Sequence, residues 1–335
     1  MAWAASPRPS WSVCDPMGPP ARVKGSKRGK LLQLAEFVPV YTAFRLAQIF
    51  PLRLGHLMCH ALGAALYYLV PRRRKVALDN LRKVYGREKT EREIKTLARR
   101  SCYSFIASLF ETVKLLCYLN NKEHAGRIRA AQEGLEPLLK KAKDIHDRAR
   151  GCVFVTPHLG NWEFLPYVAS SVGIPLVVVV RPLDNGYLEN LLYQHRAASG
   201  QLVIPKTNSV YFLQTALRQG KSVALLPDQS TMKAITVDYM GRQATTTPIP
   251  AWLALLYNRP IVVVACCRVS THFRYDGFVS DPIWPCPERG EKEEIFRLTQ
   301  EMNREMAAII WRYPDQYFWM HDRWKAYTSK GKLSL

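Results

Sequence analysis

The distribution of hydrophobic and polar residues divides the chain into three parts. Residues 1–30 are rich in Pro, Ser, Gly, Arg and Lys and contain one acidic residue, Asp15. This stretch has no apolar core and lacks the hydrophobic run of a secretory signal, so we predict a disordered basic tail. Met17 is an alternative to Met1 as the first residue.

Residues 31–75 form a largely apolar second part that ends in a basic cluster. No uninterrupted run reaches the ~20 apolar residues that a membrane span needs. The longest run, Leu54–Val70, contains two histidines and is followed by Arg72–Lys75. An amphipathic helix beside a basic cluster is typical of a segment that lies on, or inserts into, an anionic membrane surface. We predict membrane-associated helices; the alternative is a core helix with a solvated basic end.

Residues 76–335 form the third part, which we interpret as one domain with a helical lead-in over 76–148 and an α/β core over 150–328. Apolar positions recur at helical spacing in the lead-in. In the core, short β-branched runs alternate with helical segments, which predicts an α/β fold with a mostly parallel sheet flanked by helices. The predicted strands are Cys152–Thr156, Leu176–Val180, Leu202–Ile204, Ser222–Leu226 and Ile261–Cys267. The predicted helices are Glu163–Val172, Tyr187–Ser199, Val210–Arg218, Pro248–Tyr257 and Glu291–Tyr313.

Charge and cysteine content narrow the classes of function. The chain has 48 Lys and Arg against 27 Asp and Glu, a net charge of +21. Such an excess favours an anionic partner: nucleic acid, anionic lipid or an acidic carrier protein. No zinc-finger or RNA-binding signature is present, so we do not expect nucleic acid. The eight cysteines form no Cys-x-x-Cys pair and several lie in apolar runs, which predicts buried, reduced thiols in a reducing compartment.

The turn after the strand at 152–156 carries the candidate catalytic pair. His158 lies in this turn and Glu163 at the beginning of the next helix. On a continuous helix, side chains five residues apart diverge by about 140°. Gly160 permits a turn that brings the two side chains together. Of the eight histidines, only His158 is followed by an acidic residue five positions later.

A histidine and a carboxylate at the end of a buried strand suit acyl transfer to an alcohol. A neutral imidazole can remove the proton of the alcohol as it attacks a thioester, an effect worth ~10²–10⁴-fold in rate. A carboxylate on the other ring nitrogen fixes the tautomer and stabilises the imidazolium. This chemistry needs no covalent enzyme intermediate. The structural alternative is a histidine with satisfied hydrogen bonds and a surface glutamate.

Three further segments place polar groups near the same sheet edge. Arg181–Asn185 and Pro227–Gln229 follow predicted strands, and Thr245–Pro248 precedes a helix where a phosphate or an oxyanion could bind. Taken singly, these segments also fit a solvated arginine, a turn and a helix cap.

Together these segments resemble the late acyltransferases of lipid A biosynthesis, the lauroyl and myristoyl transferases of Gram-negative inner membranes. The resemblance covers about residues 40–328. Six motifs carry it in family order: Arg72–Leu81, Thr156–Glu163, Arg181–Asn185, Pro227–Gln229, Thr245–Pro248 and Pro314–Lys325.

The resemblance implies an acyltransferase domain over 76–335 with a glycerolipid-acyltransferase-like fold. His158 is then the general base and Glu163 its partner, with no metal and no cofactor. The expected donor is an acyl-acyl carrier protein, and the expected acceptor is a hydroxyl of a lipid A precursor at the cytoplasmic face of the inner membrane. The residues that we assign to substrate binding are Asn161, Arg181, Asp228, Gln229 and Thr246.

Other functions stay open at this point. The same chemistry could act on another glycolipid, such as a phosphatidylinositol mannoside, or on an amine-bearing lipid. A non-catalytic basic protein of the membrane surface predicts that His158→Ala changes no phenotype. A hydrolase predicts thioester cleavage that does not depend on an acceptor.

Overall fold

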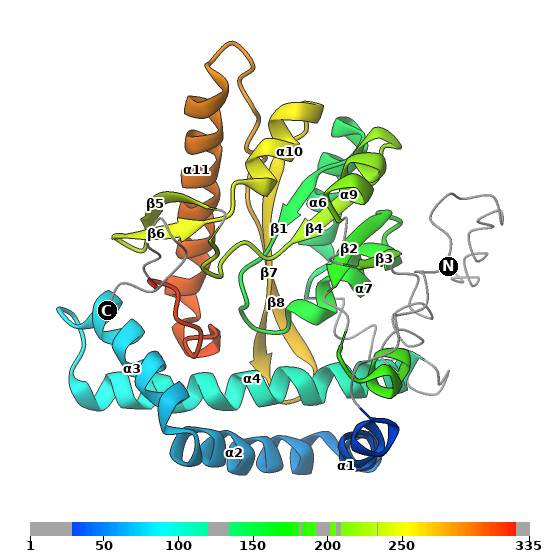
Figure 1. Ribbon diagram of the computed structural model, residues 1–335, viewed down its shortest axis with the longest axis vertical. Coiled ribbons are helices and arrows are strands. Elements are labelled where there is room, and N and C mark those ends of the chain that lie inside the picture. Colours follow the sequence, from blue (N-terminus) through cyan, green and yellow to red (C-terminus); the bar gives the residue numbers. More distant parts are fainter. Residues whose placement is uncertain are drawn as a thin grey trace.

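The computed structural model describes residues 29–119, 134–180, 183–191, 202–205, 209–232 and 234–325. Residues 1–28 of the predicted basic tail, and residues 192–199 of a predicted helix, lie outside the described residues. Within the described part, the chain has an N-terminal layer of helices and an α/β core (Figure 1).

The N-terminal layer lies across the ends of the strands at one end of the sheet, with α2 packed alongside α4 (Figure 1). Its helices are α1 (Lys30–Ile49), α2 (Leu52–Leu69), α3 (Pro71–Tyr85) and α4 (Glu91–Leu119). Among the described helices, none is by itself long and apolar enough to cross a membrane, and α2 and α3 reach that length only as a pair bent by 92°. The helices predicted over 31–75 are therefore present, and their association with a membrane stays a prediction.

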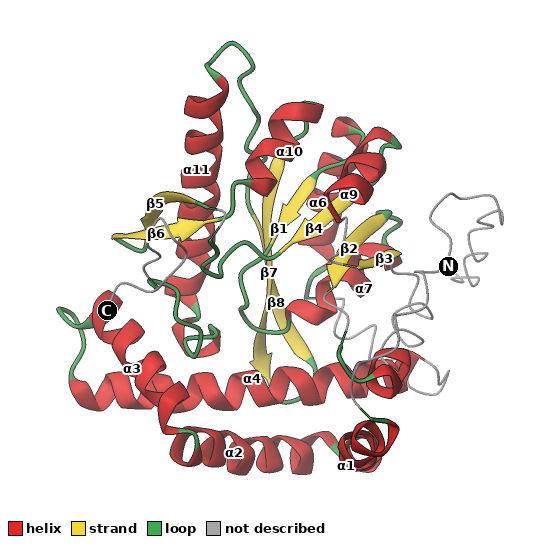
Figure 2. Ribbon diagram, viewed as in Figure 1, coloured by secondary structure: helices red, strands yellow, loops and turns green. Residues whose placement is uncertain are grey.

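The core sheet has six strands in the order β3-β2-β4-β1-β7-β8 (Figure 2). Five are the predicted strands and run parallel, whereas β8 runs antiparallel to β7. Their bounds are β1 (Val153–Val155), β2 (Leu176–Val180), β3 (Leu202–Pro205), β4 (Ser222–Leu225), β7 (Ile261–Ser270) and β8 (Arg274–Val279). The mostly parallel α/β sheet is thus confirmed.

A separate hairpin of β5 (Ile235–Tyr239) and β6 (Arg242–Thr246) was not predicted. The Met240–Gly241 turn between its strands has positive φ angles at both residues, as a tight hairpin turn requires. The polar sequence of β6 hid this strand, because apolar alternation is the main signal of a strand.

Helices cover both faces of the sheet, which explains the continuous apolar character of its strands. Val153 and Val155 belong to a buried cluster shared with the helices on one face, whereas Phe154 packs with those on the other. The first face is covered by α9 (Ser209–Arg218), α10 (Ile249–Tyr257) and α11 (Glu291–Arg312). The second is covered by α6 (Glu136–Ala149) and α7 (Leu165–Ser171).

The described cysteines are structural in character. Six of them are free, and five of these are buried, as predicted: Cys59, Cys102, Cys152, Cys266 and Cys267. Burial raises the pKa of Cys102 to about 11 and that of Cys59 and Cys152 to about 12. These thiols therefore stay protonated at neutral pH, and the thiolate is the nucleophilic form of cysteine.

Candidate active site

His158 and Asp228 meet because their strands are neighbours in register. In the parallel pair of β1 and β4, Val155 lies opposite Leu225. His158 and Asp228 each follow three residues later, so the two turns leave the sheet side by side. The Nδ1 of His158 lies 2.7 Å from Asp228 Oδ1, and the backbone N–H of His158 donates to Oδ2 at 2.8 Å. Both carboxylate oxygens of Asp228 thus bind the turn that carries the histidine.

The charges of this pair stabilise each other. Burial opposes ionisation of Asp228, but the attraction of His158, the hydrogen bonds and the charge of Arg323 lower its pKa below the ordinary value of 3.8. Burial likewise lowers the pKa of His158, but Asp228 and then Glu163 outweigh this effect, so the pKa lies above 6.5. An ionised Asp228 favours the proton on Nδ1. The Nε2 of His158 is then the basic atom.

The surroundings of Nε2 come from three segments. The Gln229 side-chain nitrogen lies 3.4 Å from Nε2, so the predicted substrate-binding Gln229 reaches the reactive atom. The ring of Trp162 packs edge-on against the imidazole at 5.2 Å, and the ring of Phe318 lies 6.3 Å away. The backbone N–H of Phe318 also donates to the carbonyl of His158 at 3.0 Å. The sequence pattern indicates Phe318 only as a packing anchor and does not single out Trp162.

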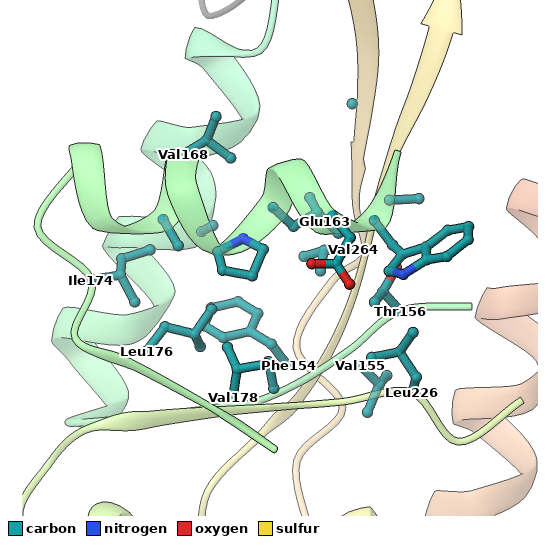
Figure 3. A pocket seen from close by; sticks show the side chains of 18 of the residues that line it. Phe154, Val155, Thr156, Glu163, Val168, Ile174, Leu176, Val178, Leu226 and Val264 are labelled. Atoms are coloured by element: carbon teal, nitrogen blue, oxygen red, sulfur yellow. The ribbon is translucent and has the colours of Figure 1, made fainter. Parts of the chain in front are cut away.

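Glu163 lies in the short 3₁₀ helix η2 (Trp162–Phe164), as expected for the first turn after His158. Its carboxylate points into a cavity (Figure 3). The sequence pattern predicts a carboxylate from Glu163 on the ring nitrogen of His158, but that place on Nδ1 is taken by Asp228. Glu163 acts on the imidazole through its charge, which raises the pKa of His158.

The cavity beside His158 is apolar and has a volume of about 300 Å³. It lies between one face of the sheet and the two helices α6 and α7 (Figure 3). Phe154, Leu176, Val178 and Val264 form its sheet side, while Val168 belongs to the helical side. Its lining also includes the polar side chains of Thr156, His158, Glu163 and Glu189. An apolar cavity with a few converging polar groups is the usual form of a small-molecule site.

Three of the predicted substrate-binding residues are buried: Asp228, whose carboxylate binds His158 and not a ligand, Asn161 and Thr246. Asn161 is fully buried and donates to the carboxylate of Glu111 at 3.2 Å. Thr246 is also fully buried, and its hydroxyl accepts a hydrogen bond from Arg323 at 2.6 Å. None of the three lines the cavity, and each binds other side chains of the protein, so their predicted contact with substrate stays a prediction. The predicted Arg181 lies outside the described residues.

Comparisons with known proteins identify the family of this chain. Residues 24–326 match the family described as bacterial lipid A biosynthesis acyltransferase. The lipid A biosynthesis palmitoleoyltransferase of Escherichia coli strain K12 is 24% identical over 279 residues, which cover 82% of this chain and 85% of that protein. The phosphatidylinositol mannoside acyltransferase of Mycolicibacterium smegmatis is 26% identical over 187 residues, which cover 54% of this chain and 59% of that protein.

Proposed function

Because the chain belongs to the bacterial lipid A biosynthesis acyltransferase family, we propose that it transfers a fatty acyl chain from an acyl-acyl carrier protein to a hydroxyl of a lipid A precursor. The observation that carries this proposal is the basic Nε2 of His158 at the end of a cavity lined by apolar side chains. The cavity fits a fatty acyl chain, and the histidine fits a general base beside the thioester carbon.

The proposed reaction proceeds by direct transfer. Nε2 of His158 removes the proton of the acceptor hydroxyl while the oxygen attacks the thioester carbonyl. The new C–O bond forms, the C–S bond breaks, and the imidazolium returns the proton to the departing thiolate of the carrier. Asp228 holds the imidazole and stabilises its charged form, as the carboxylate of a catalytic triad does.

Two other side chains complete the proposed mechanism. The carboxylate of Glu163, which lines the cavity, favours the imidazolium electrostatically during the transfer. The amide N–H of Gln229 is close enough to Nε2 to donate to the negative charge that develops on the thioester oxygen. In this proposal His158 is the general base, Asp228 takes the place on Nδ1 that the sequence pattern predicts for Glu163, and Glu163 acts through its charge.

The acceptor could also be another glycolipid. The mycobacterial relative is named for phosphatidylinositol mannosides, and its identity to this chain is similar to that of the Escherichia coli relative. Both acceptors present a sugar hydroxyl or an acyl hydroxyl to the same base, so the chemistry does not choose between them. The longer match favours the lipid A precursor.

We further propose that α1 and α2 dock this enzyme on an anionic membrane. Apolar side chains of both helices are exposed, including Leu31, Val38, Ile49, Leu57, Leu62 and Leu69. The basic cluster Arg72–Lys75 lies in the first turns of α3, the helix that follows α2 in the chain. Large exposed apolar patches mark contact surfaces, and adjacent basic residues attract anionic lipid. Cosedimentation with anionic vesicles, but weaker cosedimentation with zwitterionic ones, is the expected result.

The high positive charge also suits an acidic carrier protein as the donor. Because salt screens such an attraction over ~8 Å at physiological ionic strength, the KM for the acyl carrier donor should rise with salt. A KM that stays constant as salt increases would contradict docking by charge.

The test of the proposed function is acyl transfer from a panel of acyl-acyl carrier proteins to a tetra-acylated lipid A precursor. We compare the wild type with His158→Ala and Glu163→Ala. Acyl transfer by the wild type, at a rate that both variants lower by orders of magnitude, supports the reaction and the acceptor together. Transfer only to another membrane lipid keeps the chemistry and overturns the lipid A acceptor. Full activity in both variants overturns the proposed mechanism.

A further inference from the structure

A buried ion pair lies behind the catalytic turn and takes no part in the mechanism above. Glu111 of α4 is fully buried, and Arg268 of β7 is 8% exposed. The guanidinium binds the carboxylate with two nitrogens: Nε contacts Oε1, and Nη2 donates to Oε2 at 2.9 Å. Removing two charges from water costs free energy, which only close geometry and additional hydrogen bonds offset. The other contacts of Glu111 and Arg268 show which part of the protein this pair holds in place.

The pair is tied to the turn between His158 and Glu163 by two routes. The side chain of Asn161 donates to Glu111 Oε2 at 3.2 Å. Through the second route, Arg268 donates to the hydroxyl of Ser108 at 3.1 Å, and this hydroxyl donates to the carbonyl of Gly160 at 2.6 Å. Gly160 and Asn161 are the two residues where the chain changes direction between the two catalytic side chains.

The turn has little freedom beside these contacts. Gly160 has a φ of 59°, and a Cβ there would collide with the carbonyl oxygen of Cys266. The backbone N–H of Asn161 donates to that same oxygen at 2.8 Å. Cys266 and Arg268 are both in β7, so this strand supports the turn in two ways. Its backbone carbonyl at Cys266 binds Asn161, and its side chain of Arg268 binds Glu111, which also binds Asn161.

Glu111 is held from other directions as well. The hydroxyl of Tyr275, in β8, donates to Oε2 at 2.9 Å, and Nε2 of His56, in α2, lies 3.5 Å from Oε1. Burial lowers the pKa of His56, so this histidine is neutral at neutral pH. The carboxylate thus joins the N-terminal helices, the sheet and the catalytic turn, with Arg268 as its cationic partner.

We propose that Glu111 is a positioning residue for acyl transfer, which holds the turn of Gly160 and Asn161 so that His158 and Glu163 face one reacting centre. The inference rests on the proposed function, because it concerns the same site. Glu111 does not contact the cavity, and its effect passes through Asn161 and, by way of Arg268 and Ser108, through Gly160. A shift of the turn by ~1 Å is expected to lower the rate about 100-fold.

An exchange of amide and carboxylate tests this inference. Asn161→Asp places two carboxylates against each other, and Glu111→Gln leaves Arg268 without its anion, so each single variant should lose about 100-fold in kcat. The double variant Asn161→Asp/Glu111→Gln again has one amide and one carboxylate and the same net charge. We expect it to recover to within about tenfold of the wild-type kcat. If Asn161 contacts substrate instead, the double variant stays as slow as the slower single variant, and the inference is wrong.

A milder variant guards against loss of folding. Ser108→Ala removes one hydrogen bond to Gly160 and should lower kcat about tenfold, with KM for the acyl donor within twofold because the cavity is unchanged. The matched control is Thr299→Val on α11, where a buried hydroxyl bonds only its own helix, and this variant should keep the wild-type kcat. Equal effects of the two variants would overturn the inference.

Failure of the proposed function is distinguishable from failure of this inference. If the wild type transfers no acyl chain to any acceptor, the proposed function falls, and the imidazole chemical shifts of His158 then report the position of the turn. The single variants should move these shifts, and the double variant should restore them. Shifts that are the same in all four proteins would reject the positioning role of Glu111.

Discussion

The substitution Asp228→Asn most directly tests the proposed pairing of Asp228 with the general base His158. Asp228 is 2% exposed and accepts hydrogen bonds from the backbone N–H and from Nδ1 of His158. An asparagine has the same shape but only one acceptor oxygen. If this oxygen keeps the bond to the backbone, the amide N–H group faces Nδ1 and forces the proton onto Nε2. The imidazole is then in the wrong tautomer to accept a proton from the acceptor.

The expected loss follows from this change of tautomer. The same change in a serine-protease triad lowers kcat by about 10⁴-fold. We expect a loss of about 10³–10⁴-fold here, equivalent to about 4–5 kcal/mol of transition-state stabilisation. The pH dependence should also shift. Because the Asp228 carboxylate raises the pKa of His158, its removal lowers that pKa, and the acidic limb of the residual kcat/KM moves to lower pH.

The assay is steady-state transfer from an acyl-acyl carrier protein over a range of pH, with folding followed by circular dichroism. Asp322→Asn is the matched control, since the backbone of Asp322 binds Ser230, two residues after Asp228, whereas its carboxylate is not among the charges that shift the pKa of His158. It should keep the wild-type rate. An Asp228→Asn enzyme that folds, retains its kcat within tenfold and keeps its acidic limb in place would show that Asp228 does not serve the base.

Four further predictions concern pH, charge, chain length and stability. In the wild type, kcat/KM should fall at acidic pH with an apparent pKa above 6.5, because His158 must be neutral to act as the base and its pKa is raised. A pH–rate profile whose acidic limb has an apparent pKa below 6.5 would contradict this. Glu163→Gln should lower kcat about 10–100-fold and move the acidic limb of the pH–rate profile to lower pH. An acidic limb that stays in place would show that Glu163 does not act on His158 through its charge. Val178→Phe should fill part of the cavity and shift preference toward shorter acyl chains in a donor panel; unchanged preference would place the chain elsewhere. Asn80→Ala should lower the free energy of unfolding by about 1–3 kcal/mol, measured by thermal melting. The buried carbonyl of Trp319 and the partly buried carbonyl of His321 lose their donor in this variant.

The sequence predicts which turn carries the candidate site, but it does not predict which side chains contact each other there. The turn after β1 placed His158 and Glu163 correctly relative to strand and helix, since Pro157 and Gly160 are strong local signals. The pairing of His158 with Asp228 was not predictable, because it depends on β1 and β4 being neighbours although about 70 residues separate them. The motifs of Asn161 and Thr246 predict contact with substrate, whereas the structure buries both side chains against other parts of the protein, which their local sequence does not indicate.

Local sequence determines the alternation of strands and helices in this protein, the polar residues at the strand ends and the position of His158 in the turn after β1. Apolar periodicity and turn chemistry act over a few residues, so these features can be read along the chain. The order of the strands, the carboxylate that meets Nδ1 and the ion pair of Glu111 and Arg268 were settled by long-range packing. Such contacts depend on how buried surfaces fit together in space, and the sequence pattern around each residue contains no signal of its distant partner.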